Sequence, residues 1–173
     1  MTASANNPIL IELNADLKDK FLEMAREYKS AGEERYRAGL DDFEAFLKSL
    51  EMYRTGKDLP AGHVRSNTFF LFDGEKLIGS GSLRHALNAG LAVYGGHIGY
   101  DVRPSERRKG YGSLILQLTL EKARGRGLKR VFLTCDAENA ASARIIEKHG
   151  GKLENQTIYE PTGKLISQYW IEL

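Results

Sequence analysis

Hydrophobic residues in the first third of the chain recur at helical spacing after one short apolar run. Residues 9–13 are mostly apolar and predict a strand. A helix over residues 16–28 is predicted by apolar positions three and four residues apart, which are Leu17, Phe21, Met24 and Tyr28. A second helix, beginning near the two acids at 41–42, carries on one face Phe43, Phe46, Leu47, Leu50 and Tyr53. Glycine and proline between residues 56 and 62 then predict a loop.

Strand patterns dominate the middle of the chain. Residues 68–72 are aromatic and apolar, and the Asp73-Gly74 pair that follows favours a hairpin turn. Residues 77–84 then predict the returning strand, and residues 94–102 predict a third strand of the same antiparallel meander.

In the last third of the chain, segments with a helical pattern alternate with segments that have a strand pattern. Residues 113–124 predict a helix that is apolar almost all round, residues 131–135 a buried strand, and residues 140–149 a helix stopped by Gly150-Gly151. Two strands are expected over 153–173, around the turn at Pro161-Thr162-Gly163. The order of elements predicts an α/β (α+β) fold with a mixed, mostly antiparallel sheet and helices on both faces.

Composition narrows the class of protein. The 173 residues are 42% apolar and 28% charged, which is ordinary for a single globular domain. No apolar run approaches the roughly 20 residues of a membrane helix, and the first residues lack the pattern of a secretory signal. Cys135 is the single cysteine, so no internal disulfide is possible and a cytoplasmic location is expected. The four histidines show no metal-ligand spacing, so no metal is expected.

Basic residues are concentrated in one segment although the net charge is only +2. Between Arg103 and Arg130, nine basic residues face only two acids, Glu106 and Glu121. This local excess indicates an anionic ligand or, equally well, a solvated basic helix face. The small net charge predicts neither a nucleic-acid partner nor a membrane partner.

The most informative segment is the loop over residues 107–112, which reads Arg-Arg-Lys-Gly-Tyr-Gly between a strand and an apolar helix. Gly110 and Gly112 let the main chain turn tightly and approach a ligand. The first N–H groups of the helix have no internal partner and the helix dipole is positive there, so the segment suits a phosphate. It matches neither the Walker pattern nor the dinucleotide fingerprint, and a plain helix N-terminus is the alternative.

Residues 102–112 resemble the acyl-CoA loop of the GNAT N-acetyltransferase superfamily, which follows a strand ending in Val-x-Pro. A second segment, Asn139 to Ser142 and then Ile146 to Gly151, resembles that family's Asn-x-x-Ser and Glu-Lys-x-Gly pattern. Residues 83–88 and 95–100 resemble a bacterial subgroup with unassigned substrate. The resemblance covers nearly the whole chain and implies a single GNAT acetyltransferase domain over residues 1–173, with a flexible tail over residues 1–8.

The resemblance implies acetyl-CoA as cosubstrate, direct attack by a primary amine of a small molecule or peptide, and a possible homodimer. Val102 would pair with the pantetheine arm through its main chain, and the amides of residues 107–113 would hold the pyrophosphate. The cofactor-binding residues implied in this way are Val102, Arg103, Pro104, Arg107, Arg108, Lys109, Gly110, Tyr111, Gly112, Ser113, Asn139 and Ser142. The tyrosine that many relatives use to protonate the leaving thiolate is replaced by Ile146, and Tyr100, Tyr159 and Tyr169 are substitutes.

Two groups of residues are candidates for chemistry beyond the loop. His97 is a candidate general base, provided that a bulge turns its side chain into the cleft; otherwise it is a structural histidine. Arg84, His85 and Asn88 follow a strand and could bind a substrate carboxylate or amide, or form a solvated hairpin end. The sequence therefore predicts an N-acetyltransferase, and the alternative is a non-catalytic acyl-CoA-binding sensor.

Overall fold

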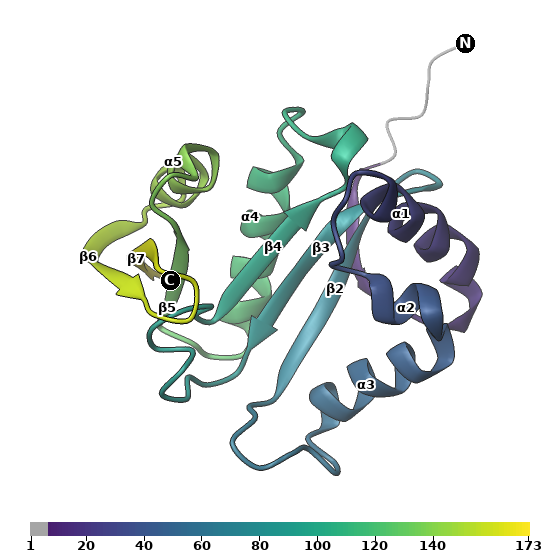
Figure 1. Ribbon diagram of the computed structural model, residues 1–173, viewed down its shortest axis with the longest axis horizontal. Coiled ribbons are helices and arrows are strands. Elements are labelled where there is room, and N and C mark those ends of the chain that lie inside the picture. The colour runs from purple at the N-terminus through teal and green to yellow at the C-terminus, as the bar shows by residue number, and fades with distance from the viewer. Residues whose placement is uncertain (1–6) are drawn as a thin grey trace.

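The computed structural model describes residues 7–173 and confirms the α+β class. Its strands form two antiparallel sheets rather than one continuous mixed sheet (Figure 1). The first sheet has the order β1-β2-β3-β4 and contains β1 (Ile9–Glu12), β2 (Ser66–Asp73), β3 (Lys76–Arg84) and β4 (Ile98–Val102). The second has the order β5-β7-β6 and contains β5 (Arg130–Asp136), β6 (Lys152–Tyr159) and β7 (Lys164–Glu172).

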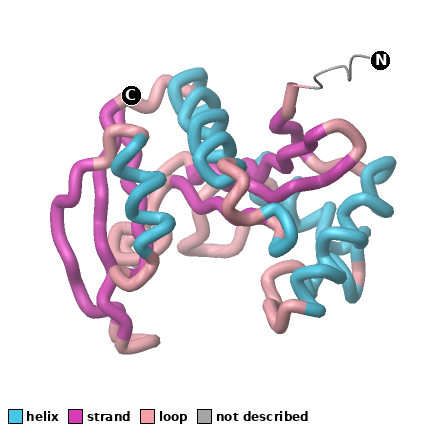
Figure 2. The backbone as a smooth tube through the Cα atoms, turned by 90° about the horizontal axis from the view of Figure 1, so that it is seen from above, coloured by secondary structure: helices cyan, strands magenta, loops and turns pink. Residues whose placement is uncertain are grey.

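The helices cover both faces of the first sheet and pack against the second. They are α1 (Lys18–Ser30), α2 (Arg37–Asp41), α3 (Phe43–Thr55), α4 (Tyr111–Gly125) and α5 (Ala140–Lys148), with short 3-10 turns at Ala15–Leu17 and Pro104–Glu106. In Figure 1, α1, α2 and α3 lie together on one side of the first sheet, and α4 lies on the other. Figure 2 shows the strands of the second sheet at one end of the molecule, with a helix beside them.

The aromatic run of β2 supplies both hydrophobic cores. Phe70 and Phe72 pack with α1 and α3, whereas Phe69 and Leu71 pack with α4 and the second sheet. Successive side chains of a strand point to opposite faces, so an uninterrupted apolar run is what a strand between two helical layers requires. The sequence pattern at this strand is thereby explained.

One helix and one strand boundary differ from the sequence expectation. Helix α2 is not anticipated, because five residues are too few to show a helical period. The third strand begins at Ile98 and not at residue 94, because Gly95 and Gly96 adopt φ values of +105° and +61°. Of the tail that was expected over residues 1–8, residues 1–6 lie outside the described part of the chain. No helix within residues 7–173 is long and apolar enough to cross a membrane.

The two sheets touch at His97 and Phe132. The His97 N–H donates to the Phe132 carbonyl at 2.7 Å, and the Phe132 N–H donates to His97 Nδ1 at 2.9 Å. A Cβ on Gly96 would lie 2.3 Å from that carbonyl oxygen, so only glycine permits this approach. Beyond the junction, β4 is the last strand of one sheet and β5 the first of the other. The fold therefore leaves two strand edges facing a gap.

Candidate active site in the gap between the sheets

The edge of β4 presents main-chain groups to this gap. The Arg84 N–H donates to the His97 carbonyl and the Arg103 N–H to the Ile78 carbonyl, both at 2.7 Å. In an antiparallel pair, alternate residues bond to the partner strand, so the main chain of Tyr100 and Val102 points away from β3. The β4 edge near Val102 can therefore accept an extended ligand as a further strand.

Beside this edge lies a pocket of about 380 Å³, here called the α4 pocket. Its lining residues come from β4, the loop before α4 and the start of α5, and are Tyr100, Asp101, Val102, Arg107, Arg108, Gly110, Gly112, Ser113, Asn139, Ala141, Ser142 and Ile145. A Cβ on Gly112 would lie 3.0 Å from Ile145 Cδ1 and 3.7 Å from Val102 Cγ2. The absence of a side chain at Gly112 thus keeps the pocket open.

The start of α4 forms part of the wall of this pocket. Gly110 is the N-cap, with φ of +90°, and Arg108 before it has φ of +63°. The first amides of α4 have no acceptor within the helix, and the positive end of the helix dipole lies at the same place. Ser113 Oγ lies 2.9 Å from His149 Nε2, so this hydroxyl is occupied by the protein itself. The chemistry of the site suits a phosphate.

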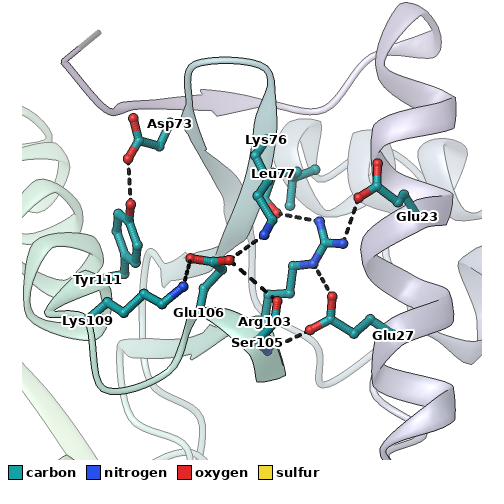
Figure 3. Close-up of polar contacts among 10 residues, drawn as sticks. All are labelled: Glu23, Glu27, Asp73, Lys76, Leu77, Arg103, Ser105, Glu106, Lys109 and Tyr111. Atoms are coloured by element: carbon teal, nitrogen blue, oxygen red, sulfur yellow. Dashed lines mark hydrogen bonds and ion pairs between the residues drawn. The ribbon is translucent and has the colours of Figure 1, made fainter. Parts of the chain in front are cut away.

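Two of the three basic side chains of the loop bind acids of the protein itself. Arg107 donates to the Val102 carbonyl at 3.0 Å and pairs with Glu33 at 2.8 Å. Lys109 pairs with Glu106 at 2.8 Å (Figure 3). Within residues 7–173, Arg108 forms no ion pair, which leaves its charge for a ligand. Within the loop, the charges of Arg107 and Lys109 are therefore neutralised by acids of the protein itself.

Three further residues that the resemblance assigns to cofactor binding have side chains that support the loop. The Arg103 guanidinium is buried and pairs with Glu23 and Glu27 of α1 (Figure 3). The Tyr111 hydroxyl donates to Asp73 at 2.5 Å, and Pro104 opens the 3-10 turn before α4. Hydrogen bonds from Lys109 and Lys76 lower the pKa of the buried Glu106 to about 2. These contacts fasten the loop to α1 and to the β2–β3 hairpin.

A second pocket, of about 450 Å³ and here called the gap pocket, lies between β4 and β5. Its lining includes Arg35, Arg84, Tyr94, Gly99, Tyr100, Thr134, Cys135, Asp136, Asn139 and Ser142. Tyr100, Asn139 and Ser142 line both pockets, so the two adjoin there. The oxygen of the Tyr100 hydroxyl lies 2.9 Å from Ser142 Oγ, and burial raises the pKa of Tyr100 to about 12. Asn139 accepts from the Ser142 N–H at 3.0 Å and caps α5.

A polar network that sequence reasoning missed fixes the other face of β4. Asp101 accepts hydrogen bonds from Tyr28, from Tyr36 and, at 2.8 Å, from Ser80. Arg35 Nε pairs with the same carboxylate at 2.7 Å. Burial and the nearby carboxylate raise the pKa of both tyrosines, which keeps their hydroxyls protonated. The partners are distant in sequence, so no local pattern signals the network.

His97 lies in the sheet junction and does not line either pocket. The β3–β4 register runs without a break from Gly79↔Val102 to Leu83↔Ile98, so the bulge that a catalytic His97 requires is absent. Its Nδ1 accepts the Phe132 N–H, and burial followed by the charge of Arg84 lowers its pKa. The geometry gives His97 the structural position that the sequence left as the alternative.

Replacing His97 by alanine is expected to destabilise the protein without slowing its chemistry. The Phe132 N–H would lose its acceptor in a buried place, which costs about 1–3 kcal/mol of the free energy of unfolding. Denaturant unfolding of His97→Ala beside His63→Ala, an exposed site, measures this loss. A turnover per folded molecule that falls 100-fold at unchanged stability would contradict the structural role.

Of the three predicted substrate residues, Arg84 and Asn88 line a further pocket of about 470 Å³ beside the loop over residues 61–64, and His85 does not. Arg84 lines the gap pocket, whereas His85 Nε2 lies 2.8 Å from Asn67 Oδ1. Asn88 donates to the Gly62 carbonyl at 2.8 Å and caps the next loop turn by accepting from the Leu91 N–H. Only Arg84 of the three faces the gap pocket.

Position 146, where many GNAT sequences have tyrosine, lies inside the core. Ile146 is fully buried, and a Cβ on Gly151 would approach its Cγ2 to 2.4 Å. The neighbouring Ile145 lines the α4 pocket instead. A tyrosine at 146 would overpack the core, so this position offers no proton donor to either pocket.

Comparison with known families gives a match over most of the chain. The model of the acetyltransferase (GNAT) family matches residues 20–151. A comparison with curated proteins returns no match. Within residues 7–173, no group of three or more histidine, cysteine or acidic side chains could hold a metal ion.

Solved structures share the fold at low sequence identity. A ribosomal L7/L12 alpha-N-protein acetyltransferase in complex with coenzyme A is 16% identical, with a TM-score of 0.71 over 96% of this chain and 94% of that chain. The microcin C7 self-immunity acetyltransferase, in complex with acetyl-CoA and AMP, is 14% identical, with a TM-score of 0.73 over 97% and 93%. A spermidine N-acetyltransferase chimera from Vibrio cholerae and hSSAT is 17% identical, with a TM-score of 0.66 over 95% and 94%.

Proposed function

Because the chain belongs to the GNAT acetyltransferase family, we propose that its two adjoining pockets hold acetyl-CoA and an acceptor amine for direct transfer of the acetyl group. The observation that carries this proposal is the meeting of the α4 pocket and the gap pocket at Tyr100 and Ser142. A thioester in one pocket and an amine in the other would face each other at that point.

In this proposal, the α4 pocket takes the pyrophosphate and the pantetheine arm. The amides at the start of α4 bind the phosphate oxygens, and Arg108 adds a charge at the rim. The main chain of Val102 pairs with the amide groups of pantetheine, as a strand pairs with a sheet edge. Its N–H then lies where it can polarise the thioester carbonyl. Arg107 holds the Val102 carbonyl and so keeps the edge in place.

The acceptor amine occupies the gap pocket and attacks the thioester carbon. The acceptor first loses one proton to water in the gap pocket, because only the neutral amine can attack. A nitrogen–carbon bond then forms, the carbon–sulfur bond breaks, and the nitrogen passes a second proton to water. Tyr100 donates its hydroxyl proton to the departing sulfur and is reprotonated from solvent. Its pKa of about 12 keeps that proton in place at neutral pH. Ser142, within hydrogen-bond distance of the hydroxyl, orients it.

The test is a measurement of CoA release from acetyl-CoA with a panel of primary amines, amino acids and polyamines, beside calorimetry with acetyl-CoA. We expect acetyl-CoA to bind and CoA release to rise above the rate without acceptor for at least one class of amine. Mass spectrometry then identifies the acetylated product. Binding of acetyl-CoA without release for any amine would contradict the proposed transfer and favour an acyl-CoA sensor.

A further inference from the structure

The charged side chains that line the gap pocket leave a net positive charge there. Arg35, Arg84 and Asp136 line it. Asp136 pairs with Lys164 at 2.6 Å, and Arg35 pairs with Asp101 at 2.7 Å. Within residues 7–173, Arg84 has no carboxylate partner. The pocket therefore carries an unpaired positive charge, which is costly in a half-buried place and favours an anionic ligand.

The Arg84 guanidinium is held in a fixed orientation at the end of β3. Its Nη1 donates to the Gly95 carbonyl at 2.9 Å and to the Gly96 carbonyl at 3.0 Å. A Cβ on Gly99 would lie 3.9 Å from Nη1 and 4.0 Å from Nη2, so the guanidinium lies over the β4 main chain at this glycine. These contacts use Nη1 and leave the donors at Nη2 and Nε for a ligand with two oxygens.

Arg35 approaches the same pocket from the loop between α1 and α2. Asp101 binds its Nε, and that carboxylate is in turn fixed by Tyr28, Tyr36 and Ser80. The Arg35 side chain is 44% exposed, and its ion pair with Asp101 is made through Nε. Burial lowers the pKa of Arg84, and the positive charge of Arg35 in the same pocket lowers it further.

The distance from this charge to the reacting atoms suits a small molecule. Arg84 lies over Gly99, the proposed proton donor Tyr100 follows it, and Val102 lies two residues further along β4. Strand residues rise by about 3.4 Å each, so the oxyanion and the acetyl carbon would be separated by about 10 Å or less. An acceptor with its amine near Tyr100 would reach Arg84 with a short chain.

We infer that the acceptor is a small amine that also bears an oxyanion, a carboxylate or a phosphate, bound by Arg84 with support from Arg35. This inference rests on the proposed function and names the class of its acceptor. A polyamine would bring further positive charge to the same guanidinium groups, which is unfavourable. Arg84 would thus determine specificity, because it binds the part of the acceptor that does not react.

The experiment compares acceptors in matched pairs with the wild-type enzyme and with Arg84→Gln. The pairs are glycine and glycinamide, β-alanine and β-alaninamide, and phosphoethanolamine and ethanolamine; spermidine is the cationic acceptor. Circular dichroism verifies that Arg84→Gln folds. Arg124→Gln, an exposed arginine of α4, is the matched control for loss of one positive charge.

We expect kcat/KM for the anionic member of a pair to be at least about tenfold higher than for its neutral partner. A ratio of this size corresponds to one charge-assisted hydrogen bond that the neutral partner cannot make. Arg84→Gln should remove this difference, because the anionic member of each pair loses more than its neutral partner, whereas Arg124→Gln should keep the difference. If kcat/KM falls most for glycine or β-alanine in Arg84→Gln, the bound oxyanion is a carboxylate; if it falls most for phosphoethanolamine, the oxyanion is a phosphate. Equal rates within every pair, a preference for spermidine, or an equal loss for both members would overturn the inference.

Failure of the proposed function is distinguishable from failure of this inference. If no amine releases CoA although acetyl-CoA binds, the transfer proposal fails, and the oxyanion site is then tested by calorimetry in the presence of CoA. Binding of β-alanine or phosphoethanolamine to the wild type, with at least about a tenfold loss in Arg84→Gln, would support the site. Absence of binding to the wild type would remove it.

Discussion

Gly112→Val is expected to raise the Kd for CoA by at least about 100-fold, because the added side chain fills the α4 pocket. Its Cβ alone would lie 3.0 Å from Ile145 Cδ1 and 3.7 Å from Val102 Cγ2, and the two methyl groups would extend further. Gly112 lies in the first turn of α4 and has no positive φ, so the helix tolerates the change. Calorimetry with CoA measures the loss.

Gly125→Val is the control for this prediction. Gly125 is the last residue of the same helix, and a Cβ there would meet nothing within 4 Å. We expect both variants to fold and only Gly112→Val to lose CoA. An unchanged Kd in folded Gly112→Val would place the CoA site elsewhere and remove the α4 pocket from the proposed function.

Tyr100→Phe is expected to lower kcat by about 10²-fold, the lower end of what general acid catalysis contributes. The phenyl ring keeps the packing of β4, and only the hydroxyl that faces Ser142 is lost. Since the Tyr100 hydroxyl is not proposed to hold CoA, the Kd for acetyl-CoA should stay within about twofold, a difference of less than 1 kcal/mol. Steady-state kinetics and calorimetry separate these two quantities.

Tyr159→Phe is the matched control, because Tyr159 belongs to β6 and lines neither pocket. Its kcat should equal that of the wild type. Because the pKa of Tyr100 is about 12, its hydroxyl stays protonated at neutral and mildly alkaline pH. Deprotonation of Tyr100 should therefore cause no fall in the wild-type rate in that pH range. A Tyr100→Phe enzyme with wild-type kcat would show that the thiolate leaves without this proton.

The sequence predicted those features that depend on neighbouring residues. The hydrophobic periods located the helices at 18–30 and 43–55 and the β2–β3 hairpin to within a few residues. The paired acids at 41–42 marked the start of α3, where Asp42 accepts the Ala45 N–H at 2.9 Å. Gly110, with its positive φ, placed the turn before α4. Each of these signals acts within one or two turns of chain, so it can be read without the fold.

The direction of the functional side chains could not be predicted in the same way. The basic residues after Val102 suggested one positive surface, but Arg103 and Arg107 pair with acids of the first helix and of the loop after it. His97 suggested a base, but an unbroken register holds it in the sheet junction. Register decides which face of a strand a side chain occupies, and it depends on the partner strand.

The sequence by itself determined the family resemblance, the order of the longer elements and the glycine-containing turn before α4, because all of these depend on local spacing. Only the tertiary structure decided that Arg84, and not His85 or Asn88, lines the gap pocket. It also decided that Asp101, Tyr28 and Tyr36 fix Arg35 beside it. These contacts join residues more than sixty positions apart, and their geometry exists only once the helices have packed on the sheet.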